Sequence, residues 1–347
     1  MKQLVFHYIW MYLVSLLSTM IFLSLDLPLP WILGPLLAVF ILKTVHERDY
    51  QLHQSIRNVS FAITGVQIGM TFTAATIGKV VPYFIPFLLF TFFIMIISIA
   101  SGILLARIAK ISKKTGVLGS IPGGLSVMVA MSDSMEANTG LVAIFHTIRL
   151  MAVLFIVPII ASFLFSSSSN NAGSIVEEPM ISGQYWTIAI YGLLFYFAYL
   201  LRHKVPASFV LIPMTIIAIL KIFSIPVMDL PSSFYHFAQL SIGIHLGLSI
   251  DYRDVKKAGK YTGLFFLITC FIILLSILFG YIFASFSNLS FATAMLSLAP
   301  GGLVEMALTA HEVDADPAIV GSLQLVRMLI IILLLPIVLS KYWKTRT

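Results

Sequence analysis

Long apolar windows dominate the chain, and only short polar or proline- and glycine-rich segments interrupt them. Residues 81–106 and 261–284 are two such windows, and about 20 apolar residues are enough to cross roughly 30 Å of hydrocarbon. The pattern predicts ten membrane-spanning helices. They lie near residues 4–24, 29–44, 56–77, 81–108, 138–165, 182–202, 206–222, 233–251, 260–286 and 316–340.

Composition supports this interpretation. The 347 residues are 59% hydrophobic and 10% charged, whereas soluble domains are about 25% charged. The one cysteine, Cys270, falls inside a predicted span. The sequence therefore predicts a multi-pass helical membrane protein without a disulfide framework or a thiolate metal site.

The chain carries an internal duplication. The motif PGGL occurs at residues 122–125 and again 178 positions later, at 300–303. Other uncommon residues keep the same ungapped register. The matched pairs include Pro28 with Pro206, Pro35 with Pro213, Gly65 with Gly243, Gly69 with Gly247, Met128 with Met306, Arg149 with Arg327 and Pro158 with Pro336. We therefore expect a first membrane repeat over 1–166, a polar linker over 167–180 and a second membrane repeat over 181–347.

The distribution of basic residues gives each repeat a direction. If each PGGL motif is a re-entrant hairpin, each repeat crosses the membrane five times, and 17 of the 21 basic residues face the cytoplasm. A sixth full crossing would move Arg202 and Lys204 outside, against the positive-inside rule. The predicted fold class is thus an all-α polytopic membrane protein with two inverted-topology repeats of about five transmembrane helices each, plus one re-entrant PGGL hairpin per repeat. Both termini are predicted to be cytoplasmic, and the location is the plasma membrane.

Two arginines are the most informative charges. Arg149 lies about ten residues into a predicted span, which places it roughly 15 Å deep, and Arg327 reaches a similar depth from the other side. A charge at that depth is costly and marks a functional site by default. Either the arginines contact an anionic ligand, or they form internal pairs that hold the helices together.

The PGGL motifs are predicted to break a helix and to expose backbone N–H groups at the start of the next one, a place that favours anions. In this motif the halves differ: Ser126 corresponds to Val304, and Val127 corresponds to Glu305. The Glu305 carboxylate could exchange a proton, bind a cation or neutralise an arginine. The predicted substrate-binding set is Arg149, Arg327, Gly123, Gly124, Ser126, Gly301, Gly302 and Glu305. The alternative for the glycines is close helix packing.

A second polar set lies on the third span of each repeat. These residues are expected either to line a path or to hold helices together. The set comprises Gly65, Gln67, Gly69, Gly243, His245 and Gly247.

No catalytic constellation is present in the sequence, which lacks H-E-x-x-H, a Walker loop and G-x-S-x-G. We expect no enzymatic activity, no cofactor and no metal site. The formal charge of +7 resides in short loops, which is typical of membrane orientation rather than of nucleic-acid binding.

The repeated elements resemble the AbrB-type membrane family. The segments that carry the resemblance are IPGGLSVMVAM at 121–131, APGGLVEMALTA at 299–310, and the arginine-bearing HTIRLMAVLFIVP and LQLVRMLIIILLLP. The resemblance covers nearly the whole chain. Its members carry labels such as transcriptional regulator or ammonia monooxygenase. A direct regulator would need a DNA-reading element and a monooxygenase would need metal ligands, and neither is found in the sequence.

Inverted repeats with interrupted helices are typical of secondary transporters. The predicted function is therefore transport of a small, anionic solute across the lipid bilayer by alternating access, coupled to H⁺ or Na⁺, with only an indirect effect on gene expression. The main alternative is a membrane sensor that binds a ligand without moving it, and a membrane oxidoreductase is a third. A homo-oligomer is compatible with the sequence.

Overall fold

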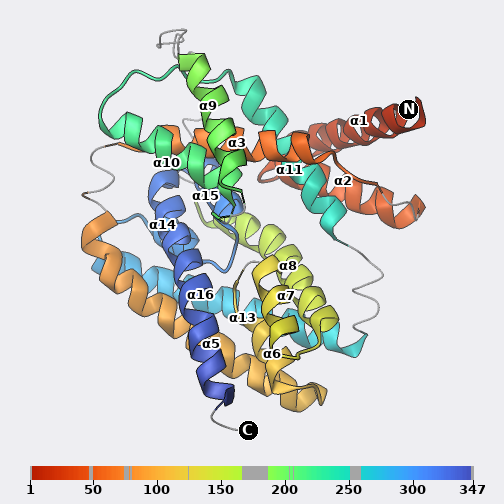
Figure 1. Ribbon diagram of the computed structural model, residues 1–347, viewed down its shortest axis with the longest axis vertical. Coiled ribbons are helices and arrows are strands. Elements are labelled where there is room, and N and C mark those ends of the chain that lie inside the picture. Colours follow the sequence, from red (N-terminus) through yellow and green to blue (C-terminus); the bar gives the residue numbers. More distant parts are fainter. Residues whose placement is uncertain are drawn as a thin grey trace. The chain divides into compact units, whose positions relative to one another are not determined.

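A computed structural model gives the fold of the chain (Figure 1). It describes residues 2–46, 50–73, 78, 80–123, 125–165, 187–202, 204–205, 207–250 and 259–344. All regular secondary structure in these ranges is helical. The predicted linker at 167–180 lies outside the described residues.

A helix occupies each of the ten predicted spans. In the first half these helices are α1 (Lys2–Ser24), α2 (Pro30–His46), α3 (Gln54–Met70), α5 (Phe84–Ala109, after the 3-10 turn Val81–Tyr83) and α8 (Thr139–Phe165). In the second half they are α9 (Thr187–Leu200), α10 (Ser208–Ile222), α11 (Ser232–Ser249), α13 (Lys260–Phe286) and α16 (Pro317–Lys344).

Helix α3 ends earlier than the predicted residue 77. The hydroxyl of Thr71 donates to the carbonyl oxygen of Ile68 at 2.7 Å, and its backbone N–H reaches the same oxygen at 3.2 Å. Both bonds satisfy a carbonyl that a continuing helix would have used, so the helix stops at Met70.

Four helical segments are long and apolar enough to cross a membrane by length and composition. They are His7–Ser24, Val81–Ala109, Thr139–Phe165 and Tyr261–Phe286. Four shorter apolar segments, Pro30–His46, Ala189–Leu200, Ser208–Ile222 and Pro317–Ile331, are the next most apolar. The chain therefore has the composition and helix lengths of a membrane protein.

Each PGGL motif separates two short helices. The first break, residues 121–124, follows α6 (Lys113–Ser120) and precedes α7 (Leu125–Ser134). The second break, residues 299–302, follows α14 (Phe291–Leu298) and precedes α15 (Leu303–Glu312). A proline lacks an N–H and disfavours helical backbone in the residue before it. Accordingly Ile121 (φ −68, ψ 132) and Ala299 (φ −57, ψ 138) are extended.

The chain forms two compact units, and each unit draws helices from both halves of the sequence. Unit 1 consists of residues 1–79, 159–251 and 307–318, and it holds α1, α2, α3, α9, α10 and α11. Unit 2 consists of residues 80–158, 252–306 and 319–347, and it holds α5, α6, α7, α13, α14 and most of α8 and α16. Both breaks therefore belong to unit 2.

Glycines set the helix spacing inside unit 1, where α3 packs on α10 and α2 packs on α11. A Cβ atom at Gly69 would lie 2.8 Å from the Met214 carbonyl oxygen, and one at Gly247 would lie 2.6 Å from that of Leu36. A Cβ at Gly65 or Gly243 would overlap a carbonyl oxygen of the same neighbouring helices. All four glycines thus allow direct backbone approach, as small residues do between membrane helices.

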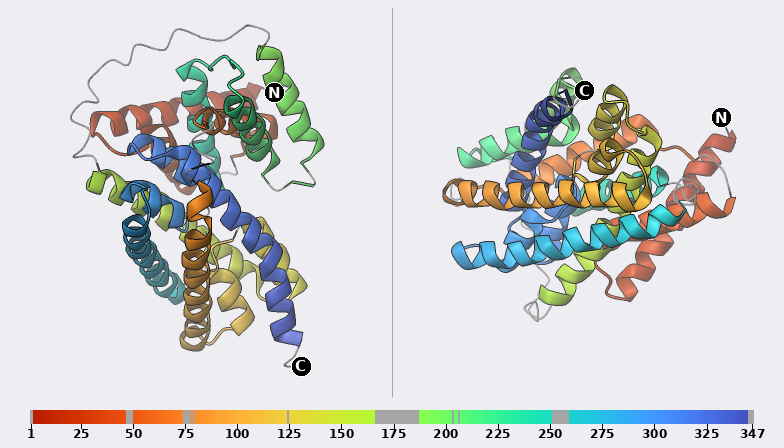
Figure 2. Two further views of the ribbon diagram at one scale, coloured as in Figure 1. Left: turned by 90° about the vertical axis from the view of Figure 1, so that its left-hand side faces the viewer. Right: turned by 90° about the horizontal axis from the view of Figure 1, so that it is seen from below.

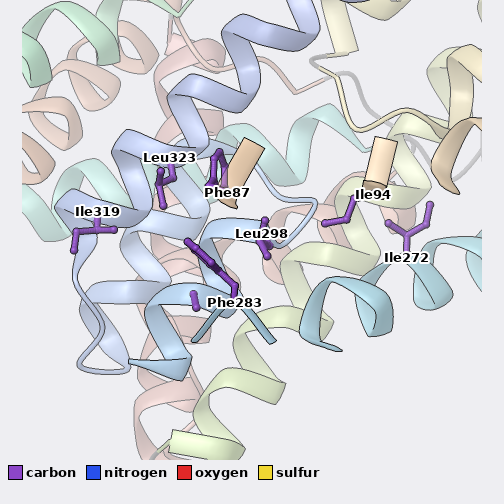
Figure 3. Packing of buried hydrophobic residues seen from close by; sticks show 8 residues of the cluster. Phe87, Ile94, Ile272, Phe283, Leu298, Ile319 and Leu323 are labelled. Atoms are coloured by element: carbon purple, nitrogen blue, oxygen red, sulfur yellow. The ribbon is translucent and has the colours of Figure 1, made fainter. Parts of the chain in front are cut away.

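The core of unit 2 lies around the two long helices α5 and α13, which run alongside each other (Figure 2, right). One cluster of buried side chains joins them to α14 and α16 (Figure 3). Its members are Phe87, Ile94, Ile272, Phe283, Ala294, Leu298, Ile319 and Leu323. A second cluster joins α5 and α13 to α8, where the rings of Phe145 and Phe265 stack at 4.5 Å. Both clusters hold the short helices next to the breaks in place.

Substitution of Gly65 tests the backbone approach in unit 1. Gly65→Ala places a methyl group against the Val210 carbonyl, and we expect a loss of about 1–3 kcal/mol of stability because the backbone must shift. Gly192→Ala is the matched control, because a Cβ there meets no atom within 4 Å; it should stabilise α9 by up to about 1 kcal/mol. Thermal unfolding in detergent measures both, and equal midpoints for the two variants would contradict the packing argument.

Candidate functional site

The two buried arginines hold the two breaks. Arg149 comes from α8 and is 9% exposed, and Arg327 comes from α16 and is 6% exposed. Each lies on a long helix of unit 2 that starts shortly after the short helix following its break. The guanidinium groups contact the broken backbone itself.

Arg149 binds the first break with two donors. Its Nη1 donates to the Ile121 carbonyl at 2.6 Å, and its Nη2 donates to the Gly123 carbonyl at 3.0 Å. The break leaves these carbonyls without helical partners, and hydrocarbon offers no water to replace them. The planar fork of an arginine suits two neighbouring acceptors. The side chain therefore stabilises the interrupted helix.

Arg327 repeats the arrangement at the second break. Its Nη1 donates to Ala299 at 2.5 Å and to Leu298 at 3.3 Å, and its Nη2 donates to Gly301 at 2.8 Å. Ala299 and Gly301 are the residues 178 positions after Ile121 and Gly123. The same backbone atoms are thus bound in both halves.

One turn before each arginine, a polar side chain orients the guanidinium. His146 accepts from Arg149 Nη2 at its Nδ1 (2.7 Å), while its Nε2 lies 3.0 Å from the Leu118 carbonyl oxygen. Because a carbonyl only accepts and an arginine only donates, this network assigns the proton to Nε2 and makes the imidazole neutral.

Gln324 takes the same place in the second half. Its Oε1 accepts from Arg327, and its Nε2 donates to Leu296 at 2.8 Å and to Ala299 at 3.1 Å. A glutamine and a neutral histidine both offer one acceptor and at least one donor. The two residue types therefore perform the same task. The sequence prediction missed this role, although both residues stand three positions before an arginine and 178 positions apart.

The glycines of the breaks make room for side chains of the following helix. A Cβ at Gly301 would meet the side chain of Met306, and one at Gly123 would meet that of Met128. A Cβ at Gly302 would overlap the Glu305 carboxylate. Gly124 lies outside the described residues, and the side chain of Ser126 is not among those described.

The Glu305 carboxylate sits at the start of its own helix. It accepts a hydrogen bond from its own backbone N–H, and one of its oxygens lies against Gly302. The N-terminus of a helix carries unpaired N–H groups and partial positive charge. Glu305 thus occupies an anion-favouring place at the start of α15.

The predicted path-lining residues lie in unit 1 rather than in unit 2 with the arginines. The glycines of this set are packing positions, as described above. Gln67 and His245 are half-buried; Gln67 Oε1 has no hydrogen-bond partner among the described residues, and the His245 ring lies edge-on to Phe61 at 6.0 Å. Whether they line a path stays a prediction.

The described residues contain no group of three or more His, Cys, Asp or Glu side chains placed to hold a metal ion. The polar chemistry of unit 2 is instead that of two guanidinium groups, one carboxylate and the N-termini of two short helices. Such groups bind and orient anions.

Comparison with known proteins places the chain in a family. The model of the family described as "Transition state regulatory protein AbrB" matches residues 5–343. The chain therefore belongs to the AbrB family. That family description names a regulator and gives no enzymatic activity.

Two relatives share most of this length. "Putative regulator AbrB" of Escherichia coli (strain K12) is 28% identical over 324 residues, which cover 92% of this chain and 91% of the relative. "Uncharacterized protein YhjN" of Bacillus subtilis (strain 168) is 23% identical over 291 residues, covering 79% of this chain and 75% of the relative.

Replacing Arg149 by lysine tests whether the guanidinium holds the break. A lysine keeps the positive charge but cannot reach Ile121, Gly123 and His146 with one planar fork. We expect Arg149→Lys to lose about 2–4 kcal/mol of stability, since hydrogen bonds to charged groups contribute about 1.5–3 kcal/mol each. Arg107→Lys, at an exposed position near the end of α5, is the control and should change stability by less than about 0.5 kcal/mol. Unfolding midpoints that agree for both variants would rule out this role.

Proposed function

We propose that the protein is a secondary transporter of a small anionic solute in the plasma membrane. The observation that carries the proposal is the pair of arginine-held helix breaks at equivalent positions of a duplicated chain. Interrupted helices in paired repeats are the usual place of substrate sites in secondary transporters. The cationic surroundings favour an anion.

In this proposal the duplicated halves are inverted repeats of about five membrane crossings each. Each break then belongs to a re-entrant hairpin, one entering from the cytoplasm and one from outside. The charge distribution supports this topology, because 17 of 21 basic residues then face the cytoplasm, together with both termini. Alternating access moves the solute between the two sides.

The coupling ion in this proposal is H⁺ or Na⁺. Glu305 is the carboxylate nearest the second break and is the residue that would exchange a proton or bind a cation during transport. Any effect on gene expression is indirect, through the concentration of the transported solute.

A second candidate function is a membrane sensor that binds the same solute without moving it. The printed name of the Escherichia coli relative, "Putative regulator AbrB", favours it. A sensor would need a cytoplasmic partner surface, for which the basic loop near Lys110, Lys113 and Lys114 is the described candidate.

Flux through reconstituted protein distinguishes the two functions. Purified full-length protein in liposomes should accumulate a labelled carboxylate or other small anion when a proton or sodium gradient is imposed. Protein-free liposomes and liposomes without a gradient are the controls. If the folded protein moves none of the anions under either gradient, the transporter proposal is wrong, and binding without flux then supports the sensor.

A further inference from the structure

The two breaks differ in what they leave unpaired. At the second break, Arg327 uses both hydrogens of Nη1 and both of Nη2, on three carbonyls and on Gln324. At the first break, Arg149 makes three bonds, so that Nε–H and one Nη1–H have no partner among the described residues. The first break thus keeps one more free donor.

Ser120 adds a second unpaired group at the first break. It is the last residue of α6, directly before Ile121, and is only 1% exposed. Its carbonyl accepts from Ser98, but its own hydroxyl has no hydrogen-bond partner among the described residues. A buried hydroxyl without a partner costs about 1–3 kcal/mol. The equivalent residue of the second half is Leu298, which has no such group.

The start of the following helix shows the opposite asymmetry. At α15 the Glu305 carboxylate already occupies the N-terminus. At α7 the equivalent residue is Val127, and the residue before it is Ser126 rather than a valine. The second break therefore carries its own anion, whereas the first offers hydroxyl and N–H donors and no carboxylate.

Charge balance gives the same result. Arg149 and Arg327 are close enough to repel each other electrostatically, Glu305 supplies one negative charge, and the His146 imidazole is neutral by its hydrogen bonds. These groups carry a net charge of one positive unit. Buried charge is stable only when it is compensated.

We propose that the first break alone is the ligand site, and that it takes one monoanion, whose carboxylate-like group lies at the start of α7 as Glu305 lies at the start of α15. Arg149 and the Ser120 hydroxyl donate to this anion. Glu305 is its built-in counterpart in the second half. The proposal rests on the proposed function for its substrate class but concerns binding alone.

Exchange of the two equivalent residues tests the site. The probes are acetate, propionate and succinate, titrated calorimetrically into the purified full-length protein. The wild type should bind one monocarboxylate per chain. Val127→Glu ties a carboxylate to the start of α7 and should weaken binding at least about tenfold, since a tethered group competes at high effective concentration. Ala130→Glu, at an exposed position of α7, is the control and should bind like the wild type.

The reverse exchange covers the case in which Val127→Glu does not fold. Glu305→Val copies the first half into the second and should raise the stoichiometry from one anion to two per chain, or select succinate over acetate. Ser120→Ala should weaken binding several-fold without lowering the unfolding midpoint of the ligand-free protein, because the hydroxyl makes no bond there.

The possible failures are separable. Absence of binding by all three probes, unchanged binding in Val127→Glu, or a stoichiometry that stays at one in Glu305→Val overturns the inference. Flux that persists unchanged in Val127→Glu overturns it while leaving the transporter function intact. Binding that Val127→Glu abolishes, in a protein that shows no flux, supports the inference and contradicts only the transport.

Discussion

The structure depends on backbone carbonyl groups that the two helix breaks leave without helical partners. In hydrocarbon these groups must be paired within the protein, because an unpaired buried carbonyl costs several kcal/mol. A guanidinium from a neighbouring long helix pairs them at each break, at 2.5–3.0 Å from the carbonyls of residues 121, 123, 299 and 301. The cost of burying an arginine and the cost of breaking a helix thus offset each other. This compensation lets a sequence of membrane composition interrupt itself twice.

The same register governs contacts far from the arginines. Ser112 and Ser290 cap α6 and α14 with identical 3.2 Å bonds to Thr115 and Thr293. In unit 1, α3 lies on α10 as α2 lies on α11, with a glycine against a carbonyl at each crossing. Each half therefore supplies helices to both units. The places where the halves differ, such as Ser120 with Leu298 and Val127 with Glu305, are few and cluster at the breaks, and this confinement directs attention to them as determinants of specificity.

Much of this organisation follows from the sequence, since apolar windows locate every long helix and proline before two glycines locates both breaks. The partners of the arginines could not be predicted in this way. The sequence offered an anion or an ion pair, and the structure shows carbonyls, because partner choice depends on rotamers and on where the chain folds back. His146 and Gln324 were missed for a related reason: residues of different type perform one task, which only their hydrogen bonds show. The glycines of α3 and α11 were left between path and packing, and only the distance to the neighbouring backbone decides for packing.

The central claim is that the two breaks enter the membrane from opposite sides. Lys110 and Asn288 are equivalent exposed residues just before α6 and α14. In a Cys270→Ala background, single cysteines at these two positions can be labelled in intact cells with a membrane-impermeant maleimide. The account predicts that Asn288→Cys reacts from outside, while Lys110→Cys reacts only after the cells are opened. Labelling of both cysteines from the same side would contradict it.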